Sequence, residues 1–281
     1  MGSVVLAAKI THVPSIWLSL QTGTKHEGIR QNAVDGLVEL GRRARERGAD
    51  TFIVLDVHWQ NNAGFHLNAR EHVTGSYASH ELPHFISGLR YDYRGDPELA
   101  RLVVDEIRAA GMKALAHDVP DLGFEYGTLV PMHLMNPDGD LRVLSVGVNI
   151  YASIEEQRLV GEALRRAVDA SDRDVALLAS GSLSHEFPPN AISETKLNEH
   201  TNEFNRQVDM RVLELWQAGR MAEFIAMLPE YAKRCHGEAG MGDTAMLFGA
   251  LGWDAYRGRG ELLGRFFGST GTGQANVEFT L

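Results

Sequence analysis

Three apolar runs along the chain have the pattern of buried strands, and each is followed by a histidine. Residues 4–10 lead into His12, residues 52–55 lead into Asp56 and His58, and residues 175–179 lead into His185. A short apolar run between polar segments is typical of a strand covered on both faces of a parallel sheet. Ligands of open α/β sheets bind at the carboxyl ends of the strands. We therefore expect the three histidines to converge at that edge.

Helical patterns alternate with these runs. Apolar positions recur at helical spacing from Ile29 to Ala44, and Gly48 is a suitable stop. Asp96 and Pro97 are suited to begin a second helix, and Ser153 with Glu156 forms a capping box for a third. Further helices are expected over residues 204–215, 222–228 and 245–251, and a further strand over residues 141–148. The chain is predicted to be one α/β domain, residues 1–281, with a central, mostly parallel sheet flanked by helices.

Two segments lack a clear period. Residues 61–95 are rich in His, Asn, Tyr and Gly, and so long an irregular stretch is either functional or misinterpreted. The glycine-rich residues 268–274, GSTGTGQ, resemble a phosphate-binding loop but lack its lysine and its strand–loop–helix setting. We expect this segment to be a flexible or pocket-lining tail.

Composition narrows the class of protein. The net charge of −10 argues against broad nucleic-acid binding, which requires basic patches. A single cysteine, Cys235, excludes an intramolecular disulfide framework. The sequence shows no signal peptide and no apolar stretch approaching the ~20 residues of a membrane span. A cytoplasmic location without membrane association is expected.

The residue types at the strand ends indicate metal chemistry. Two imidazoles and one carboxylate on one face form the triad that suits non-haem Fe(II) and leaves coordination positions open. Zinc hydrolases use similar ligands, so residue types alone do not choose the metal. Cys235 beside His236 could be a nucleophile, although a small semi-buried thiol is the better interpretation.

Several separated motifs share one resemblance. They are AAKITHVPS around His12, IVLDVHW around His58, ELPHF at 81–85, EYGTLVPM at 125–132, LASGSLSHEF around His185, LPEYA at 228–232, HGEAGMGDT around Glu238, LGWD at 251–254 and GTGQ at 271–274. Together they resemble the class III (LigB-type) extradiol ring-cleaving dioxygenases. Within that class the sequence is most similar to the bacterial 3,4-dihydroxyphenylacetate (homoprotocatechuate) 2,3-dioxygenases. The likeness runs nearly end to end.

The resemblance implies that Fe(II) is bound by His12, His58 and Glu238. From spacing alone, Glu230 would be as suitable as Glu238. His185 matches the acid/base residue of the class, because an imidazole titrates near neutrality. A fourth ligand or a structural histidine is the alternative for His185.

One position departs from the pattern of the class. Tyr126 stands where many members have a histidine, so we expect it to be a hydrogen-bond donor beside the site and not a second base. His117 could supply a further donor, with a structural role equally suited. The candidates for binding a substrate carboxylate include the cations Lys9, Arg30, Lys196 and Arg234. Ser182 and Ser184 could assist as hydroxyl donors, although turn-stabilising roles suit them better.

The implied activity is meta cleavage of a catechol by O₂, with 3,4-dihydroxyphenylacetate as the expected substrate, to a 2-hydroxymuconic semialdehyde product in aromatic catabolism. The expected partners are a small-molecule catechol, O₂ and further copies of the chain in a homo-oligomer. Alternatives are another catechol or a 2-aminophenol as substrate, a zinc-dependent hydrolase with the same ligands, or an inactive metal-binding relative.

Overall fold

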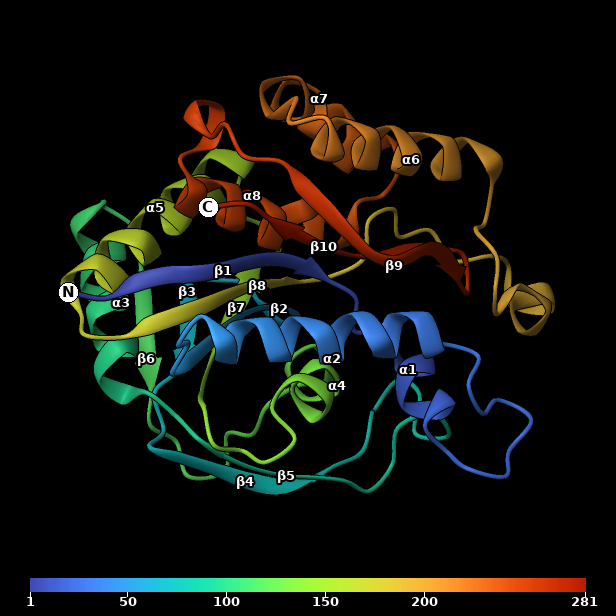
Figure 1. Ribbon diagram of the computed structural model, residues 1–281, viewed down its shortest axis with the longest axis horizontal. Helices are drawn as coiled ribbons and strands as arrows, with labels where there is room; N and C mark the ends of the chain where they lie inside the picture. Colours follow the sequence, from blue (N-terminus) through green and yellow to red (C-terminus); the bar gives the residue numbers. More distant parts are fainter.

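An eight-stranded sheet forms the centre of the protein (Figure 1). The computed structural model describes the whole chain, residues 1–281, apart from the side chain of Glu194. The strand order is β6-β3-β7-β2-β8-β1-β10-β9, and β4 and β5 form a separate hairpin. The strands are β1 (Ser3–Ile10), β2 (Thr51–Asn61), β3 (Phe65–Asn68), β4 (His72–Tyr77), β5 (Leu89–Arg94), β6 (Ala114–His117), β7 (Arg142–Asn149), β8 (Asp174–Ser180), β9 (Gly260–Ser269) and β10 (Thr272–Phe279).

The four strands in the middle of the sheet, β7, β2, β8 and β1, run parallel to one another. β10 runs antiparallel to β1 on one side and to β9 on the other, and β3 is antiparallel to β7. The expected mostly parallel α/β architecture is therefore confirmed. The parallel core places the carboxyl ends of β1, β2 and β8 side by side.

Helices cover both faces of the sheet (Figure 1). The helices are α1 (Pro14–Ser19), α2 (Gln31–Glu46), α3 (Pro97–Ala109), α4 (Tyr126–Met135), α5 (Ile154–Ala170), α6 (Glu203–Gln217), α7 (Met221–Arg234) and α8 (Gly242–Leu251), with short 3₁₀ turns η1 (Asn190–Lys196), η2 (Glu238–Met241) and η3 (Trp253–Ala255). α1, α2 and α4 pack with the β4–β5 hairpin on one face, whereas α3, α5, α6, α7 and α8 pack on the other.

Alternate residues of β2 belong to two different apolar cores. Phe52 and Val54 contact the core under α2 and α4, whereas Ile53 and Leu55 contact the core under α3, α5 and α8. Successive side chains of a strand point to opposite faces, so a strand covered on both sides must be apolar throughout. This burial explains the continuous apolar run in the sequence.

The structure decides between the alternatives left open for the two irregular segments. Residues 61–95 contain β3, β4, β5 and the end of β2, whose polar and aromatic residues hide the alternating pattern of half-exposed strands. Residues 268–274 are not a flexible tail, because they form the tight turn between β9 and β10 and the buried start of β10. In the described part of the chain, no helix has both the length and the apolar character needed to cross a membrane.

Candidate metal centre

His12 lies two residues past the end of β1 and is buried. Its Nδ1 lies 3.1 Å from the hydroxyl of Ser180, the last residue of the adjacent strand β8. That hydroxyl donates its own hydrogen to the carbonyl of Gly127, at 2.5 Å, so it accepts from His12. Nδ1 therefore carries the hydrogen, and the lone pair of Nε2 is free to bind a metal.

His58 reaches the same region because β2 bulges out of the sheet. Asp56 pairs with Gly147 of β7, but the next pairing is between Gln60 and Val148, so the residues between them leave the ladder. The buried carboxylate of Asp56 accepts the amide hydrogen of His58 at 2.8 Å and fixes the bend. Bulges of this kind re-aim side chains next to functional sites.

The carboxylate of Asp56 is itself held from α4. Its Oδ2 accepts the hydroxyl hydrogen of Thr128 at 2.7 Å. A Cβ at Gly127 would lie 2.1 Å from Oδ1 of Asp56, so a glycine is required where the helix approaches the bulge. α4 thus supports both histidines, since it orders Ser180 behind His12 and Asp56 beneath His58.

Glu238 lies in a bent segment between α7 and α8. Three non-glycine residues around it have left-handed backbone conformations, with φ of 49° at His236, 46° at Ala239 and 60° at Met241. Such conformations are unfavourable for residues with a Cβ and persist only where the surrounding structure imposes them. The bend allows the buried side chain of Glu238 to point at the strand ends while its Oε2 accepts the amide hydrogen of Ser182.

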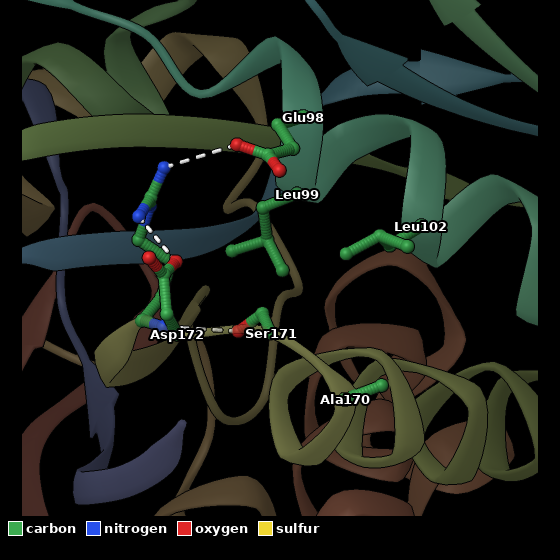
Figure 2. Close-up of a pocket in the computed structure, with 7 residues that line it drawn as sticks. Glu98, Leu99, Leu102, Ala170, Ser171 and Asp172 are labelled. Carbon is green, nitrogen blue, oxygen red and sulfur yellow. Dashed lines mark hydrogen bonds and ion pairs between the residues drawn. The ribbon is translucent and has the colours of Figure 1, made fainter. Parts of the chain in front are cut away.

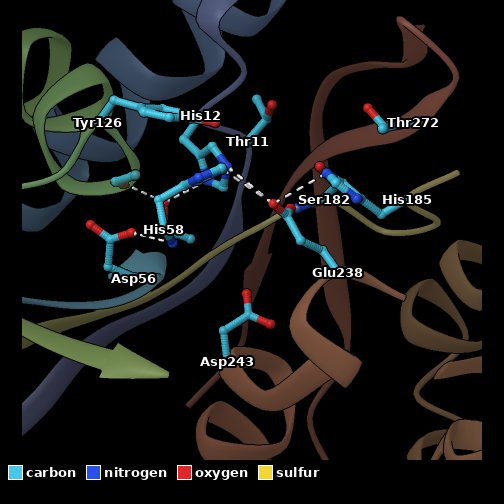
Figure 3. A network of polar contacts seen from close by, with 12 residues as sticks. Thr11, His12, Asp56, His58, Tyr126, Ser182, His185, Glu238, Asp243 and Thr272 are labelled. Carbon is cyan, nitrogen blue, oxygen red and sulfur yellow. Dashed lines mark hydrogen bonds and ion pairs between the residues drawn. The ribbon is translucent and has the colours of Figure 1, made fainter. Parts of the chain in front are cut away.

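These side chains meet at one point (Figure 3). Oε1 of Glu238 lies 3.3 Å from Nε2 of His58, 3.7 Å from Nε2 of His12 and 3.4 Å from Nε2 of His185. Ligand-type atoms of His12, His58 and Glu238 all lie within 4.8 Å of one another. Two imidazole nitrogens and one carboxylate oxygen at this separation form a donor set that fits a divalent transition metal.

The electrostatics of the cluster favour an ionised carboxylate beside basic rings. Burial alone would raise the pKa of Glu238, but His185 and His12 hold that pKa well below its ordinary value. Burial likewise disfavours a charged His58, yet the hydrogen bond and charge of Glu238 outweigh it and raise the pKa of His58. A bound cation would compete with protons for the same nitrogen and oxygen atoms.

Tyr126 packs against the cluster as the first residue of α4. Its ring centroid lies 3.8 Å from that of His58, and its hydroxyl donates to Oε2 of Glu81 at 3.3 Å. Burial raises its pKa further above the ordinary value of a phenol, with the charges of Glu81 and Glu238 adding to the effect. Tyr126 therefore stays protonated and can donate a hydrogen bond.

Glu81 was not singled out by sequence reasoning beyond its place in the ELPHF motif. Its Oε1 lies 4.0 Å from Nδ1 of His58, on the ring edge opposite the nitrogen that faces Glu238. At this distance the carboxylate does not hydrogen-bond to the ring, but its charge contributes to the raised pKa of His58. The ELPHF motif was the available signal, but nothing in its spacing connects it to His58.

His117 lies apart from the cluster, at the end of edge strand β6. Its Nε2 is 2.8 Å from Nδ1 of His66, the two rings stack at 4.8 Å, and Trp59 packs near its edge. Burial and the neighbouring His66 lower its pKa. These contacts tie β6 to β3 and match the structural interpretation of His117.

The four candidate cations have different surroundings. Lys9 forms a buried ion pair with Asp243, and Lys196 pairs with Glu199 on the surface. Arg30 is buried against the hydroxyl of Ser15, at 2.8 Å, and the carbonyl of Leu197, at 2.6 Å. The guanidinium of Arg234 lies 5.5 Å from the ring centroid of Phe204.

A cavity of about 380 Å³ lies elsewhere, between the start of α3 and the end of α5. Figure 2 shows its lining, which includes Glu98, Leu99, Ser171 and Asp172. Ser171 and Asp172 lie just before the first residue of β8, whereas His185 lies after its last residue. The cavity is therefore at the amino end of β8, away from the histidine cluster. It shares no residue with the histidine cluster.

Comparison with known proteins identifies the family. The sequence model described as the catalytic LigB subunit of aromatic ring-opening dioxygenase matches residues 6–280. The chain belongs to the LigB family. This LigB chain is 48% identical over 260 residues to a 3,4-dihydroxyphenylacetate 2,3-dioxygenase of Escherichia coli, covering 92% of this chain and 94% of that protein.

Two further similarities support the assignment. The LigB chain is 30% identical over 249 residues to the 2-aminophenol 1,6-dioxygenase beta subunit of a Pseudomonas species, covering 83% of this chain and 78% of the relative. A crystal structure of an uncharacterized protein from Escherichia coli K12 shares the fold, with a TM-score of 0.68 at 15% identity over 98% of this chain and 100% of that chain. The LigB chain is an extradiol ring-cleaving dioxygenase, with a site suited to a metal cofactor.

Proposed function

We propose that the protein cleaves 3,4-dihydroxyphenylacetate with O₂, using Fe(II), to a 2-hydroxymuconic semialdehyde product. The 48% identity to a dioxygenase of that name over nearly the whole of both chains carries the substrate proposal. A 2-aminophenol is the second candidate substrate, because a relative at 30% identity acts on it.

In this proposal His12, His58 and Glu238 hold the metal. The free Nε2 of His12, the bulge that carries His58 and the bent segment at Glu238 all support it. Two imidazoles and one carboxylate are a donor set that suits Fe(II), which, when held there, would supply the Lewis-acid and electron-transfer chemistry for a reaction between a catechol and O₂. A zinc site for hydrolysis remains the rival assignment, and metal analysis separates the two.

His185 is the proposed acid/base residue. Its Nε2 lies as near to Glu238 as that of His58 does, and its side chain is only about one quarter exposed. From this position it can accept a proton from a catechol hydroxyl and return it later in the reaction. The edge of the Phe187 ring packs on His185, with centroids 4.8 Å apart, and limits the orientations of the imidazole.

Tyr126 is proposed to support His58 and, by turning its hydroxyl hydrogen away from Glu81, to donate a hydrogen bond toward oxygen atoms at the site. Replacing it with phenylalanine keeps the ring that packs on His58 but removes the hydroxyl. We expect Tyr126→Phe to retain metal and to lose about tenfold in kcat, the usual effect of one lost donor being of this order or larger. Wild-type kcat in this variant would restrict Tyr126 to packing.

We leave His117 outside the proposed catalytic set, because its contacts with His66 and Trp59 account for it.

The deciding experiment is anaerobic reconstitution with Fe(II), followed by oxygen uptake with 3,4-dihydroxyphenylacetate. We expect stoichiometric uptake and a yellow ring-cleaved product. Iron retained without uptake, but with turnover of 2-aminophenol, would replace the substrate and keep the reaction class. Retention of zinc in place of iron would contradict the proposed cofactor.

The ligand assignment has its own test. Alanine in place of His12, His58 or Glu238 is expected to abolish stoichiometric metal binding, measured by elemental analysis of the folded protein. His72→Ala is the matched control, because His72 is an exposed histidine on β4 paired with Asp92. Full metal content in any of the three ligand variants would remove that residue from the set.

Assembly and location complete the proposal. We propose a cytoplasmic homo-oligomer in which residues 1–281 form one catalytic domain. The lone cysteine fits a reducing compartment. Light scattering of the purified protein measures the oligomeric state, and a monomer at all concentrations would contradict it.

A further inference from the structure

Asp209 is a fully buried carboxylate that the proposed chemistry does not use. It lies on the inner face of α6, and its partners are neutral donors. Oδ2 accepts the hydroxyl hydrogen of Ser184 at 2.7 Å, and Oδ1 accepts the amide hydrogen of Ser184 at 3.2 Å and the hydroxyl hydrogen of Tyr231 at 2.7 Å. Burying a carboxylate without a counter-ion is costly, so these contacts indicate a specific task.

The nearest basic group does not balance this charge. Nε2 of His200 lies 3.9 Å from Oδ2 of Asp209, beyond hydrogen-bonding distance. Burial lowers the pKa of His200 to about 4 and raises the pKa of Asp209 to about 6. At neutral pH, therefore, an ionised Asp209 faces an uncharged ring, and the hydroxyl and amide donors hold the carboxylate in place.

The contacts of Asp209 converge on the loop that carries His185. Each amide of this loop donates to a different part of the fold. Gly181 donates to Ile10 of β1, Ser182 to Glu238, Leu183 to Gly273 of β10, Ser184 to Asp209 of α6 and His185 to Cys235 at the end of α7. Among these acceptors, Asp209 accepts two hydrogen bonds from the same loop residue, one from the amide and one from the hydroxyl of Ser184.

The rest of the structure makes room for this carboxylate. A Cβ at Gly273 would lie 1.8 Å from Oδ2 of Asp209 and 3.2 Å from Oγ of Ser184. Gly273 also accepts the amide hydrogen of Leu183 at 2.8 Å and donates its own amide hydrogen to the carbonyl of Ser184 at 2.9 Å. β10 therefore approaches the loop closely on the side where the carboxylate enters.

Asp209 also connects the loop to the helix that precedes Glu238. Tyr231, which donates to Asp209, lies in the last turn of α7, and the carbonyl of Cys235 that follows it accepts the amide hydrogen of His185 at 3.2 Å. Asp209 thus contacts both the loop that carries His185 and the helix α7 that leads to Glu238. Displacing it would move the backbone on either side of His185.

We propose that Asp209 is a positioning residue for His185. By holding the amide and hydroxyl of Ser184, it fixes the loop so that Nε2 of His185 points at Oε1 of Glu238. This inference rests on the acid/base role proposed for His185. Asp209 acts through the loop and does not contact the substrate.

Asp209→Asn in the Fe(II)-loaded protein tests the proposal. Asparagine keeps the shape, but one of the two acceptor oxygens becomes an NH₂ group, so the amide and hydroxyl of Ser184 and the hydroxyl of Tyr231 cannot all keep donating to residue 209. We expect unchanged metal content, kcat lower by about a hundredfold for a misplaced catalytic group, and little change in KM. The pH profile of kcat should shift, because the group it reports has moved.

Glu214→Gln is the matched control, because Glu214 is an exposed carboxylate on the same helix, paired with Arg211. It should behave as wild type. Asp209→Asn with wild-type kcat and an unchanged pH profile would overturn the proposal.

Ser184→Ala provides a second route if Asp209→Asn does not fold. It removes the hydroxyl donor but leaves the amide contact, so we expect a smaller loss of kcat with metal retained. Where both variants fold, the two substitutions should be non-additive, since they break one shared interaction. Retention of wild-type kcat by Ser184→Ala, or strict additivity, would contradict the proposal.

A crystal structure of a Fe(II)-loaded variant separates this inference from the function on which it rests. Displacement of the Ser184–His185 segment in Asp209→Asn, or in Ser184→Ala, together with a loss of kcat supports positioning. If His185→Gln keeps full turnover, the acid/base proposal fails on its own. If the Ser184–His185 segment of both variants superposes on that of the wild type, the positioning role of Asp209 fails, even where His185→Gln shows that His185 is essential.

Discussion

At the scale of single residues, His200 gives the fold a pH dependence. Its side chain is 9% exposed, and burial lowers its pKa to about 4. Between pH 6.5 and 4 the unfolded chain therefore binds a proton that the folded chain does not. The contribution of His200 to the free energy of unfolding falls as the pH drops through this window and is fully present above it, whereas Asp209, whose pKa burial raises to about 6, acts in the opposite direction.

We expect His200→Gln to flatten that dependence. One pKa unit corresponds to about 1.4 kcal/mol, so the wild type should lose roughly 2 to 4 kcal/mol relative to the variant between neutral pH and pH 4. Urea unfolding of both proteins at several pH values measures the difference. Asp209 is present in both proteins, so its own titration is common to the two curves. Parallel curves for the two proteins would show that His200 titrates normally in the folded state.

Cys235 is expected to be unreactive in the folded protein. Its side chain is buried, and burial together with the charge of Asp209 raises the pKa of the thiol to about 11. The thiolate is the reactive form, and it is scarce at pH 8. Thiol-specific reagents should label Cys235 only after unfolding, and rapid labelling of the native protein would contradict this expectation.

The residues of the site differ in how well the sequence revealed them. The convergence of His12, His58 and His185 followed from their positions after apolar strands, because parallel strands end at one edge. The geometry at Glu238 depends on left-handed conformations at His236, Ala239 and Met241, which no periodic pattern encodes. For Glu238, therefore, only the family resemblance distinguished it from Glu230.

At the scale of elements, a buried ion pair joins β1 to α8. Lys9 of β1 and Asp243 of α8 are 1% and 0% exposed, and they meet beside Gly181. A Cβ at Gly181 would lie 2.6 Å from Oδ2 of Asp243 and 2.8 Å from Nζ of Lys9. The pair thus holds α8, which begins directly after the Glu238 segment, against the strands.

Lys9→Met should destabilise the protein by about 3 to 5 kcal/mol, because it leaves Asp243 buried without its partner. Arg42→Met is the matched control on α2, since Arg42 and Glu46 form an exposed pair whose loss should change stability little. Chemical denaturation measures both variants. Equal effects would mean that the buried pair is not needed to dock α8.

Helices with capping residues in the local sequence could be predicted, whereas strands whose burial depends on pairing with distant strands could not. Asp96, whose side chain accepts the amide hydrogen of Leu99 at 3.0 Å, and the capping box of Ser153 and Glu156 gave correct helix starts. β4 carries polar residues on its open face, and β10 contains glycine and polar residues that are buried by pairing with β1 and β9. Their burial comes from tertiary contacts, so local propensity could not indicate it.

At the scale of the whole molecule, the last strand completes the sheet. Every residue of β10 is buried, and β10 separates β1 from β9. We expect deletion of residues 260–281 to expose the edge of β1 and to abolish cooperative folding. Circular dichroism melting of the truncated chain tests this, with deletion of the exposed Leu281 alone as control. A cooperative transition in the truncated protein would show that β1 can serve as an edge.

The overall architecture was the most accessible level from sequence. Alternating strands and helices gave the α/β class and its mostly parallel sheet, because each buried strand must be apolar on both faces. The antiparallel hairpin of β9 and β10 at the edge, and the separate β4–β5 hairpin, carry weaker signals. Their places in the fold depend on pairings distant in sequence.

The proposed ligands are spread over almost the whole chain, and this has a consequence for biosynthesis. His12 and His58 leave the ribosome early, but Glu238 is made only after most of the chain has been synthesised. Until then a growing chain presents at most two of the three ligands and lacks the carboxylate. With the proposed ligand set, we therefore expect complete metal binding only after the segment that carries Glu238 has been synthesised and the sheet is nearly complete.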